Sequence, residues 1–78
     1  MASVIVLGKG CHNCRATARL ITKVAEASGK TIELEKVEDF EEIARYGILS
    51  TPGVVIDGKV VHAGGVPSRD KIEQWLAA

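Results

Sequence analysis

Cys11 and Cys14 are the residues of this 78-residue chain whose type and spacing most directly suggest chemistry. Only His12 and Asn13 separate them, so a disulfide between them would close a loop too short to constrain the unfolded chain much. Two neighbouring thiols can instead exchange electrons with another disulfide or bind a soft metal ion. The spacing therefore favours redox chemistry or metal binding over a structural crosslink.

The segments on either side of Cys11 predict a strand followed by a helix. Ser3 to Leu7 is a nearly continuous, β-branched apolar run, which is typical of a strand buried on both faces. After a glycine-rich loop, small and apolar residues recur at helical spacing from Cys11 to about Ser28. The predicted buried face of this helix comprises Cys14, Thr17, Ala18, Ile21, Val24, Ala25 and Ser28.

This placement makes the two thiols unequal. Cys11 would lie at the helix N-terminus, where unpaired N–H groups and the helix dipole stabilise a thiolate and lower the pKa of the thiol. Cys14 would lie one turn further on, on the apolar face, where it should be more buried and less ionised. The asymmetry suits one attacking and one resolving sulfur.

Four neighbours of the pair are candidate modulators of the Cys11 thiolate. Lys9, His12 and Arg15 bring positive or titratable charge close to it in the sequence, and Asn13 completes the segment between the cysteines. A partial positive charge on His12 would favour the thiolate and so the reduced form. His12 could equally be a solvated loop residue.

The net charge of zero arises by cancellation between two segments. Residues 9–30 hold five positive and one negative side chains, and residues 31–44 hold one positive and six negative side chains. Arg15, Arg19 and Lys23 recur at i, i+4 and i+8, so they form a like-charge stripe along the helix. The stripe is either a solvated face or a surface that attracts an acidic partner or a small anionic thiol.

The rest of the chain completes an α/β pattern. Thr31–Val37 is predicted to be a strand that is either short or at an edge of the sheet, and it is followed by a short helix capped by Asp39 in a capping box with Glu42. The remaining predicted elements are a strand at Val54–Ile56, an Asp57-Gly58 hairpin turn, a returning strand at Lys59–His62 and a helix at Ser68–Leu76. The order is β-α-β-α-β-β-α. Parallel pairing of the first β-α-β unit and an antiparallel final hairpin predict a four-stranded mixed sheet covered by helices, in one domain over residues 1–78. Phe40 and Trp75 are expected in the core.

Combined with Thr51-Pro52 directly before the third strand and the Asp57-Gly58 hairpin, the C-x-x-C motif resembles the thioredoxin fold. The chain is most similar to small single-domain thioredoxin-like and glutaredoxin-like redox proteins. The resemblance implies a protein thiol-disulfide oxidoreductase with Cys11 as nucleophile and Cys14 as resolving cysteine. It also implies that Pro52 is cis and, with Thr51, binds the backbone of the partner.

The resemblance further implies which partners the protein has. They are protein disulfide substrates and an upstream reductase, in a role in electron transport and cell redox homeostasis, and no bound cofactor is needed because the sulfurs carry the electrons. His12-Asn13 stands where thioredoxins have Gly-Pro, so their redox potential is not carried over. Gly64-Gly65 and Asp70 are similar to the glutathione-binding end of glutaredoxins, but their spacing differs. Glutathione therefore stays an alternative partner, with Lys9 as a contact for its carboxylate.

Metal binding is the alternative function for the same cysteines. Copper or zinc could be coordinated by Cys11, Cys14 and His12. A structural zinc site, however, needs four ligands, which commonly come from two separated pairs. Copper carriers with a C-x-x-C between a first strand and helix follow a different element order, β-α-β-β-α-β. His62 is expected to be a plain strand residue rather than a ligand, and we predict no metal site. A non-catalytic adaptor is a third possibility.

Composition excludes several classes of function. The neutral balance of 10 basic and 10 acidic residues argues against binding nucleic acid by bulk charge. The 46% hydrophobic content argues against disorder. No apolar run approaches the roughly 20 residues that span a bilayer, and Met1 to Leu7 lacks the features of a secretory signal. We therefore expect a monomer in the cytoplasm with no membrane or nucleic-acid partner.

Overall fold

The structure is a computed structural model that describes residues 2–77, so Met1 and Ala78 of the predicted domain lie outside the described residues. The elements are β1 (Ala2–Leu7), α1 (His12–Ala27), β2 (Ile32–Val37), α2 (Phe40–Arg45), β3 (Gly53–Ile56), β4 (Lys59–Ala63) and α3 (Arg69–Ala77). The predicted order β-α-β-α-β-β-α is confirmed, with boundaries shifted by one residue at several ends.

The four strands of the described chain form one mixed sheet in the order β2-β1-β3-β4. β1 pairs parallel with β2 and antiparallel with β3, and β3 pairs antiparallel with β4. The β3–β4 turn has positive φ at both Asp57 (50°) and Gly58 (84°), as a two-residue hairpin turn requires. The sheet therefore puts β1 at its centre and β2 at an edge, as the sequence predicts.

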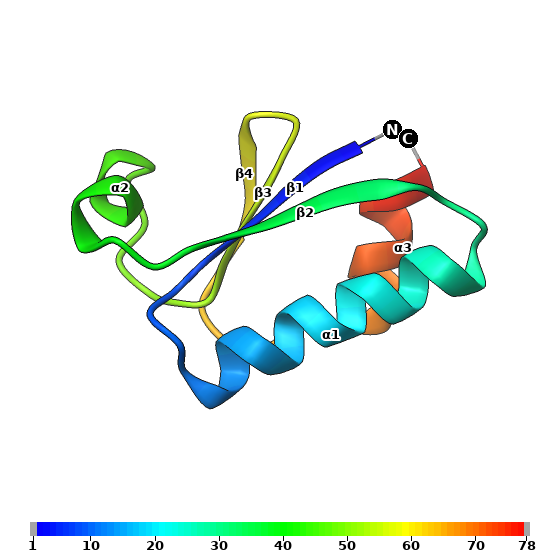
Figure 1. Ribbon diagram of the computed structural model, residues 1–78, viewed down its shortest axis with the longest axis horizontal. Coiled ribbons are helices and arrows are strands. Elements are labelled where there is room, and N and C mark those ends of the chain that lie inside the picture. Colours follow the sequence, from blue (N-terminus) through cyan, green and yellow to red (C-terminus); the bar gives the residue numbers. More distant parts are fainter. Residues whose placement is uncertain (1, 78) are drawn as a thin grey trace.

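One face of the sheet is covered by α1 and α3, which lie side by side below it in Figure 1. Nine residues from these helices and from β1 and β3 form the large cluster: Val4, Val6, Ala18, Ile21, Val24, Ala25, Val54, Ile72 and Leu76. Trp75 is partly buried against it. Ser28, which the helical spacing placed on the buried face, is instead the exposed C-cap of α1, because the helix ends at Ala27.

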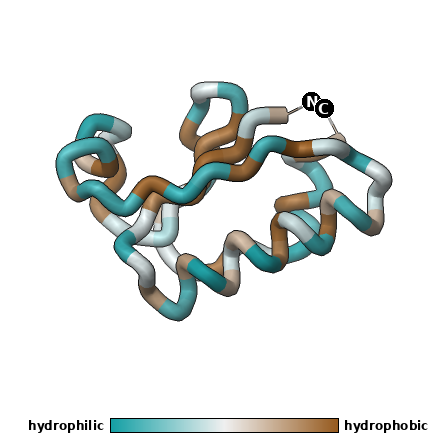
Figure 2. Tube along the Cα trace, viewed as in Figure 1, coloured by the Kyte–Doolittle hydropathy of each residue, from teal (hydrophilic) through white to brown (hydrophobic). Residues whose placement is uncertain are grey.

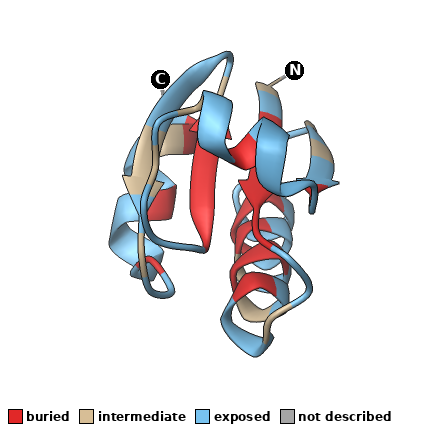
Figure 3. Ribbon diagram, turned by 90° about the vertical axis from the view of Figure 1, so that its left-hand side faces the viewer, coloured by how far each residue is buried: buried red, intermediate tan, exposed pale blue. Residues whose placement is uncertain are grey.

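The opposite face carries α2 and the small cluster of Leu7, Val37, Ile43 and Val55. Hydrophobic and hydrophilic residues alternate along most of β2 (Figure 2), and burial is concentrated on β1, β3 and one side of α1 (Figure 3).

Two expectations for α2 are wrong. Phe40, expected in the core, is 66% exposed, because it is the first residue of α2 and Ile43 takes the position that faces the sheet. Asp39 is the N-cap, but its carboxylate accepts from the N–H of Glu41 at 3.2 Å rather than from Glu42. The predicted capping box is therefore replaced by a single N-cap bond.

Among the described residues, no helix has the length and apolar composition that crossing a bilayer requires.

Candidate functional site

The cysteine pair lies at the N-terminus of α1, just after the loop that connects β1 to this helix. Cys11 is the extended N-cap of α1, with φ −75° and ψ 161°, and its sulfur is bonded to that of Cys14 in a disulfide. The backbone N–H of Cys14 points at the Cys11 Sγ, 3.1 Å away. The Cys11 sulfur therefore takes the place that a serine or aspartate oxygen fills at other helix N-termini. A thiolate formed there on reduction would keep this donor and the positive end of the helix.

The two sulfurs differ in exposure, as their helical positions predict. Cys11 is partly exposed, whereas Cys14 is 5% exposed and lies on the buried side of α1. A Cβ added at Gly8 would overlap the Cys14 Sγ and come within 3.6 Å of the Thr51 Cβ. Cys14 is therefore enclosed between α1, the end of β1 and the Thr51 loop, and Cys11 is the more exposed residue of the pair.

The Thr51–Pro52 segment forms the other wall of the site. Its peptide bond is cis, and Pro52 is fully buried while Thr51 is exposed. The Pro52 carbonyl accepts from the N–H of Gly64 at 2.9 Å, which ties the segment to the end of β4. Among residues 2–77, the backbone groups of Thr51 bond to no other backbone group. They are thus available to an incoming strand.

The four candidate modulators lie around the pair but do not all point at it. The Lys9 ammonium lies 4.9 Å from the centre of the Phe40 ring, and the Arg15 guanidinium donates to the Gly10 carbonyl at 2.7 Å. Both contacts hold the loop that leads into Cys11. His12 and Asn13 are exposed on the first turn of α1. Their effect on the thiolate stays a prediction.

Sequence reasoning missed three residues beside Cys14. Gly8 leaves the space that the Cys14 sulfur fills, and Lys36 and Glu38 line a pocket of about 120 Å³ that also touches Cys14. A signal for Glu38 was present, since it directly follows the strand that runs parallel to β1. Carboxyl ends of parallel strands meet at the same edge of a sheet, so Glu38 and the cysteine loop had to be neighbours.

Within residues 2–77, no group of three or more His, Cys, Asp or Glu side chains is placed to hold a metal ion. His62 lies in β4 with Nε2 3.0 Å from the Gly65 carbonyl oxygen and its ring 5.9 Å from that of Trp75. These contacts fit the expected strand residue.

Comparison with known proteins gives a family match over almost the whole chain. The thioredoxin domain family model matches residues 2–77. A thioredoxin of Methanocaldococcus jannaschii is 36% identical over 76 residues, covering 97% of this chain and 87% of the relative. A thioredoxin of Methanothermobacter thermautotrophicus is 27% identical over 77 residues, covering 99% of this chain and all (100%) of the relative.

Solved structures agree on the fold. Chloroplastic thioredoxin z superposes with a TM-score of 0.70 at 19% identity, covering 99% of this chain and 76% of the other. The germline-specific thioredoxin Deadhead of Drosophila melanogaster gives a TM-score of 0.68 at 19% identity, covering 97% of this chain and 78% of the other. At these identities the likeness concerns the fold alone.

Proposed function

The chain belongs to the thioredoxin domain family and is a protein thiol-disulfide oxidoreductase, and we propose that Cys11 is its nucleophile and Cys14 its resolving cysteine. The observation that carries this assignment is the unequal environment of the two sulfurs. Cys11 is partly exposed and receives the Cys14 N–H at the start of α1, whereas Cys14 is 5% exposed. A partner disulfide can reach Cys11, and the buried Cys14 is held next to it.

The reaction begins from the reduced protein. The Cys11 thiolate attacks one sulfur of the partner disulfide, so a bond forms between Cys11 and that sulfur while the partner's other sulfur leaves as a thiolate and takes up a proton. Cys14 loses its proton and attacks the Cys11 sulfur, which breaks the mixed disulfide and releases the second partner thiolate. Two electrons and the proton from Cys14 pass to the partner, the second partner thiolate takes a proton from water, and the Cys11–Cys14 disulfide of the structure remains. A reductase returns the pair to the dithiol.

The Thr51–Pro52 segment is proposed to hold the partner's backbone beside Cys11. Support comes from the unpaired backbone groups of exposed Thr51 and from the anchoring of Pro52 to Gly64. An extended partner segment could pair with these groups as an added strand does. The segment would then be aligned for attack without any cofactor.

The partner and compartment are proposed more broadly. We propose that the protein is cytoplasmic, because one reactive cysteine pair without further cysteines fits a reducing compartment. We also propose that it acts as a monomer. Glutathione is the weaker of the partner proposals, since Lys9, the expected contact for its carboxylate, lies over the Phe40 ring. His12 and Asn13 are proposed to tune the redox potential from their exposed positions.

Trapping of mixed disulfides tests the two roles. Cys14→Ser removes the resolving sulfur and leaves the attacking one, so its mixed disulfides should persist on non-reducing gels. Cys11→Ser, the matched variant, leaves a buried thiol and should trap little. Equal trapping by both variants, or stronger trapping by Cys11→Ser, would show that the roles are assigned wrongly. Trapping by neither would contradict thiol exchange by the pair.

A further inference from the structure

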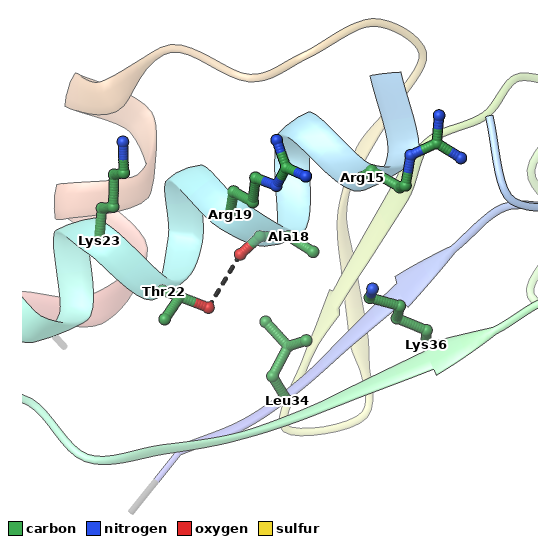
Figure 4. Close-up of a pocket in the computed structure, with 7 residues that line it drawn as sticks. All are labelled: Arg15, Ala18, Arg19, Thr22, Lys23, Leu34 and Lys36. Atoms are coloured by element: carbon green, nitrogen blue, oxygen red, sulfur yellow. Dashed lines mark hydrogen bonds between the residues drawn. The ribbon is translucent and has the colours of Figure 1, made fainter. Parts of the chain in front are cut away.

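An open groove of about 460 Å³ runs between α1 and the edge strand β2. Its lining residues are Arg15, Ala18, Arg19, Thr22, Lys23, Leu34 and Lys36. Figure 4 shows Arg15, Arg19 and Lys23 on successive turns of α1, with Leu34 and Lys36 opposite them on β2. The like-charge stripe noted in the sequence is therefore one wall of a groove with an apolar floor.

Within the described residues, no ion pair involves a cation of this groove. The ion pair found in residues 2–77 joins Arg69 and Glu73 on α3, so the groove cations have no carboxylate partner there. Leu34 and Lys36 face the groove, and strand alternation therefore turns Glu33 and Glu35 to the other face of β2. The acidic run that balances the charge of the chain thus does not cover the groove.

The groove leads to the cysteine pair. Arg15 and Lys36 also line the smaller pocket that reaches Cys14 and Gly10, and Glu38 is the acidic residue at this inner end. In the sheet, β1 has β2 on one side and β3 on the other, so the groove flanks the disulfide on the side opposite Pro52. A molecule bound in the groove would lie beside the pair without occupying the Thr51–Pro52 segment.

We propose that this groove docks an extended, acidic segment of a protein partner whose disulfide is exchanged at Cys11, an inference that rests on the proposed function. Cations four residues apart on a helix are separated by about 6 Å along its axis. Side chains two residues apart on an extended strand are separated by about 6.7 Å. An extended segment with an acidic residue at every second position therefore matches the spacing of Arg15, Arg19 and Lys23, while its intervening side chains can contact Leu34.

The shape of the groove favours a chain over a small anion. The three α1 cations span about 12 Å of helix axis rather than converging on one point. A single phosphate or carboxylate could contact only part of this stripe. A peptide can satisfy the whole length and still place a cysteine near Cys11.

Peptide probes test the proposal on the intact reduced protein. One peptide carries a cysteine as a mixed disulfide with 2-thiopyridine, flanked by alternating Glu and Ser, and its counterpart has Gln in place of Glu. The release of thiopyridone is followed with time. We expect the acidic peptide to react about tenfold faster than the neutral one at low ionic strength. This preference should disappear at about 1 M salt, where the Debye length is about 3 Å.

Two charge-matched double variants locate the preference. The variant Arg19→Glu/Lys23→Glu should lower the ratio of acidic to neutral peptide rates to about one or below. The control variant Lys59→Glu/Lys71→Glu, with its substitutions on β4 and α3, should retain most of the wild-type preference for the acidic peptide. An equal loss of the acidic preference in both variants would overturn docking in the groove, because the preference would then depend only on the net charge of the protein.

Two further results separate the remaining outcomes. A wild-type ratio near one would overturn the groove while leaving the proposed function intact, because both peptides would still react. The acidic preference could also disappear when phosphate replaces chloride at constant ionic strength. That result would overturn peptide docking and indicate that the groove binds a small anion instead. No reaction with either peptide would overturn the proposed function and this inference with it.

Discussion

The two faces of the sheet are built differently, and the cysteine pair lies where they meet. The face under α1 and α3 holds nine buried hydrophobic residues, whereas the face under α2 holds four. β1 contributes to both, with Val4 and Val6 on the first and Leu7 on the second. The large cluster fixes the helix that carries the cysteines. The small cluster supports the segments around the site, since Tyr46 and Ile48 pack against it just before the Thr51 loop.

The two faces of the sheet therefore contribute differently to the stability of the fold and to the positioning of the loops around the cysteine pair. A 16-residue helix with one fully packed face is held by many contacts, so α1 presents its N-terminus as a rigid unit. The six-residue α2 is held mainly through Ile43, and the exposed Phe40 and Leu49 beside it add little burial. We infer that most of the folding free energy comes from the large-cluster face, while the small-cluster face mainly orders the loops.

The largest expected effect compares one isoleucine from each cluster. Ile21→Ala should reduce the free energy of unfolding by about 4 kcal/mol, because Ile21 is completely buried in the large cluster. Ile43→Ala should cost about 2 kcal/mol, because its thinner surroundings can close over the space that is left. Urea unfolding followed by circular dichroism measures both values.

A control is needed because about 4 kcal/mol is a large part of the stability of a small domain. Should Ile21→Ala fail to fold, Ile21→Val and Ile43→Val give the same comparison at about 1 kcal/mol or less each. A larger loss at Ile43 than at Ile21 in either pair would reverse the inferred roles of the two faces.

A second prediction concerns Gly8, at the junction of the two faces. In the oxidised protein an alanine Cβ there would overlap the Cys14 Sγ, and overpacking of this kind costs about 2 kcal/mol. The free thiol of the reduced protein can rotate away, so Gly8→Ala should favour the dithiol by about 30-fold at equilibrium with a glutathione series. Gly29→Ala is the control, since it has positive φ and no neighbour within 4 Å and should destabilise both redox forms alike. An unchanged equilibrium for Gly8→Ala would mean that the site absorbs the methyl group.

The sequence predicted the large-cluster face better than the small-cluster face, for a physical reason. The buried face of α1 follows the helical period over four turns, and all its predicted members except Ser28 are buried. In the short α2, one hydrophobic position is enough to face the sheet, so the period does not distinguish Phe40 from Ile43. The positions of Cys11, Cys14 and Pro52 follow from local motifs, and that of Glu38 follows from the parallel pairing of β1 and β2. Gly8 and Lys36 lie near Cys14 through contacts between separate segments that no local pattern encodes.

The smallest expected effect tests which face controls the chemistry of Cys11. In Cys14→Ser, where Cys11 is the remaining thiol, the alkylation rate should rise with pH to a midpoint below that of a free thiol, which is about 8.5. The cause is the start of α1, where the N–H of residue 14 lies 3.1 Å from the Cys11 Sγ. Because α2 lies on the other face, adding Ile43→Ala should leave the midpoint of the titration unchanged even though the protein is less stable. A midpoint at the free-thiol value would remove the activation of Cys11 from the mechanism. A midpoint that moves with Ile43→Ala would instead show that the small cluster sets the position of the α1 N-terminus as well as that of the loops.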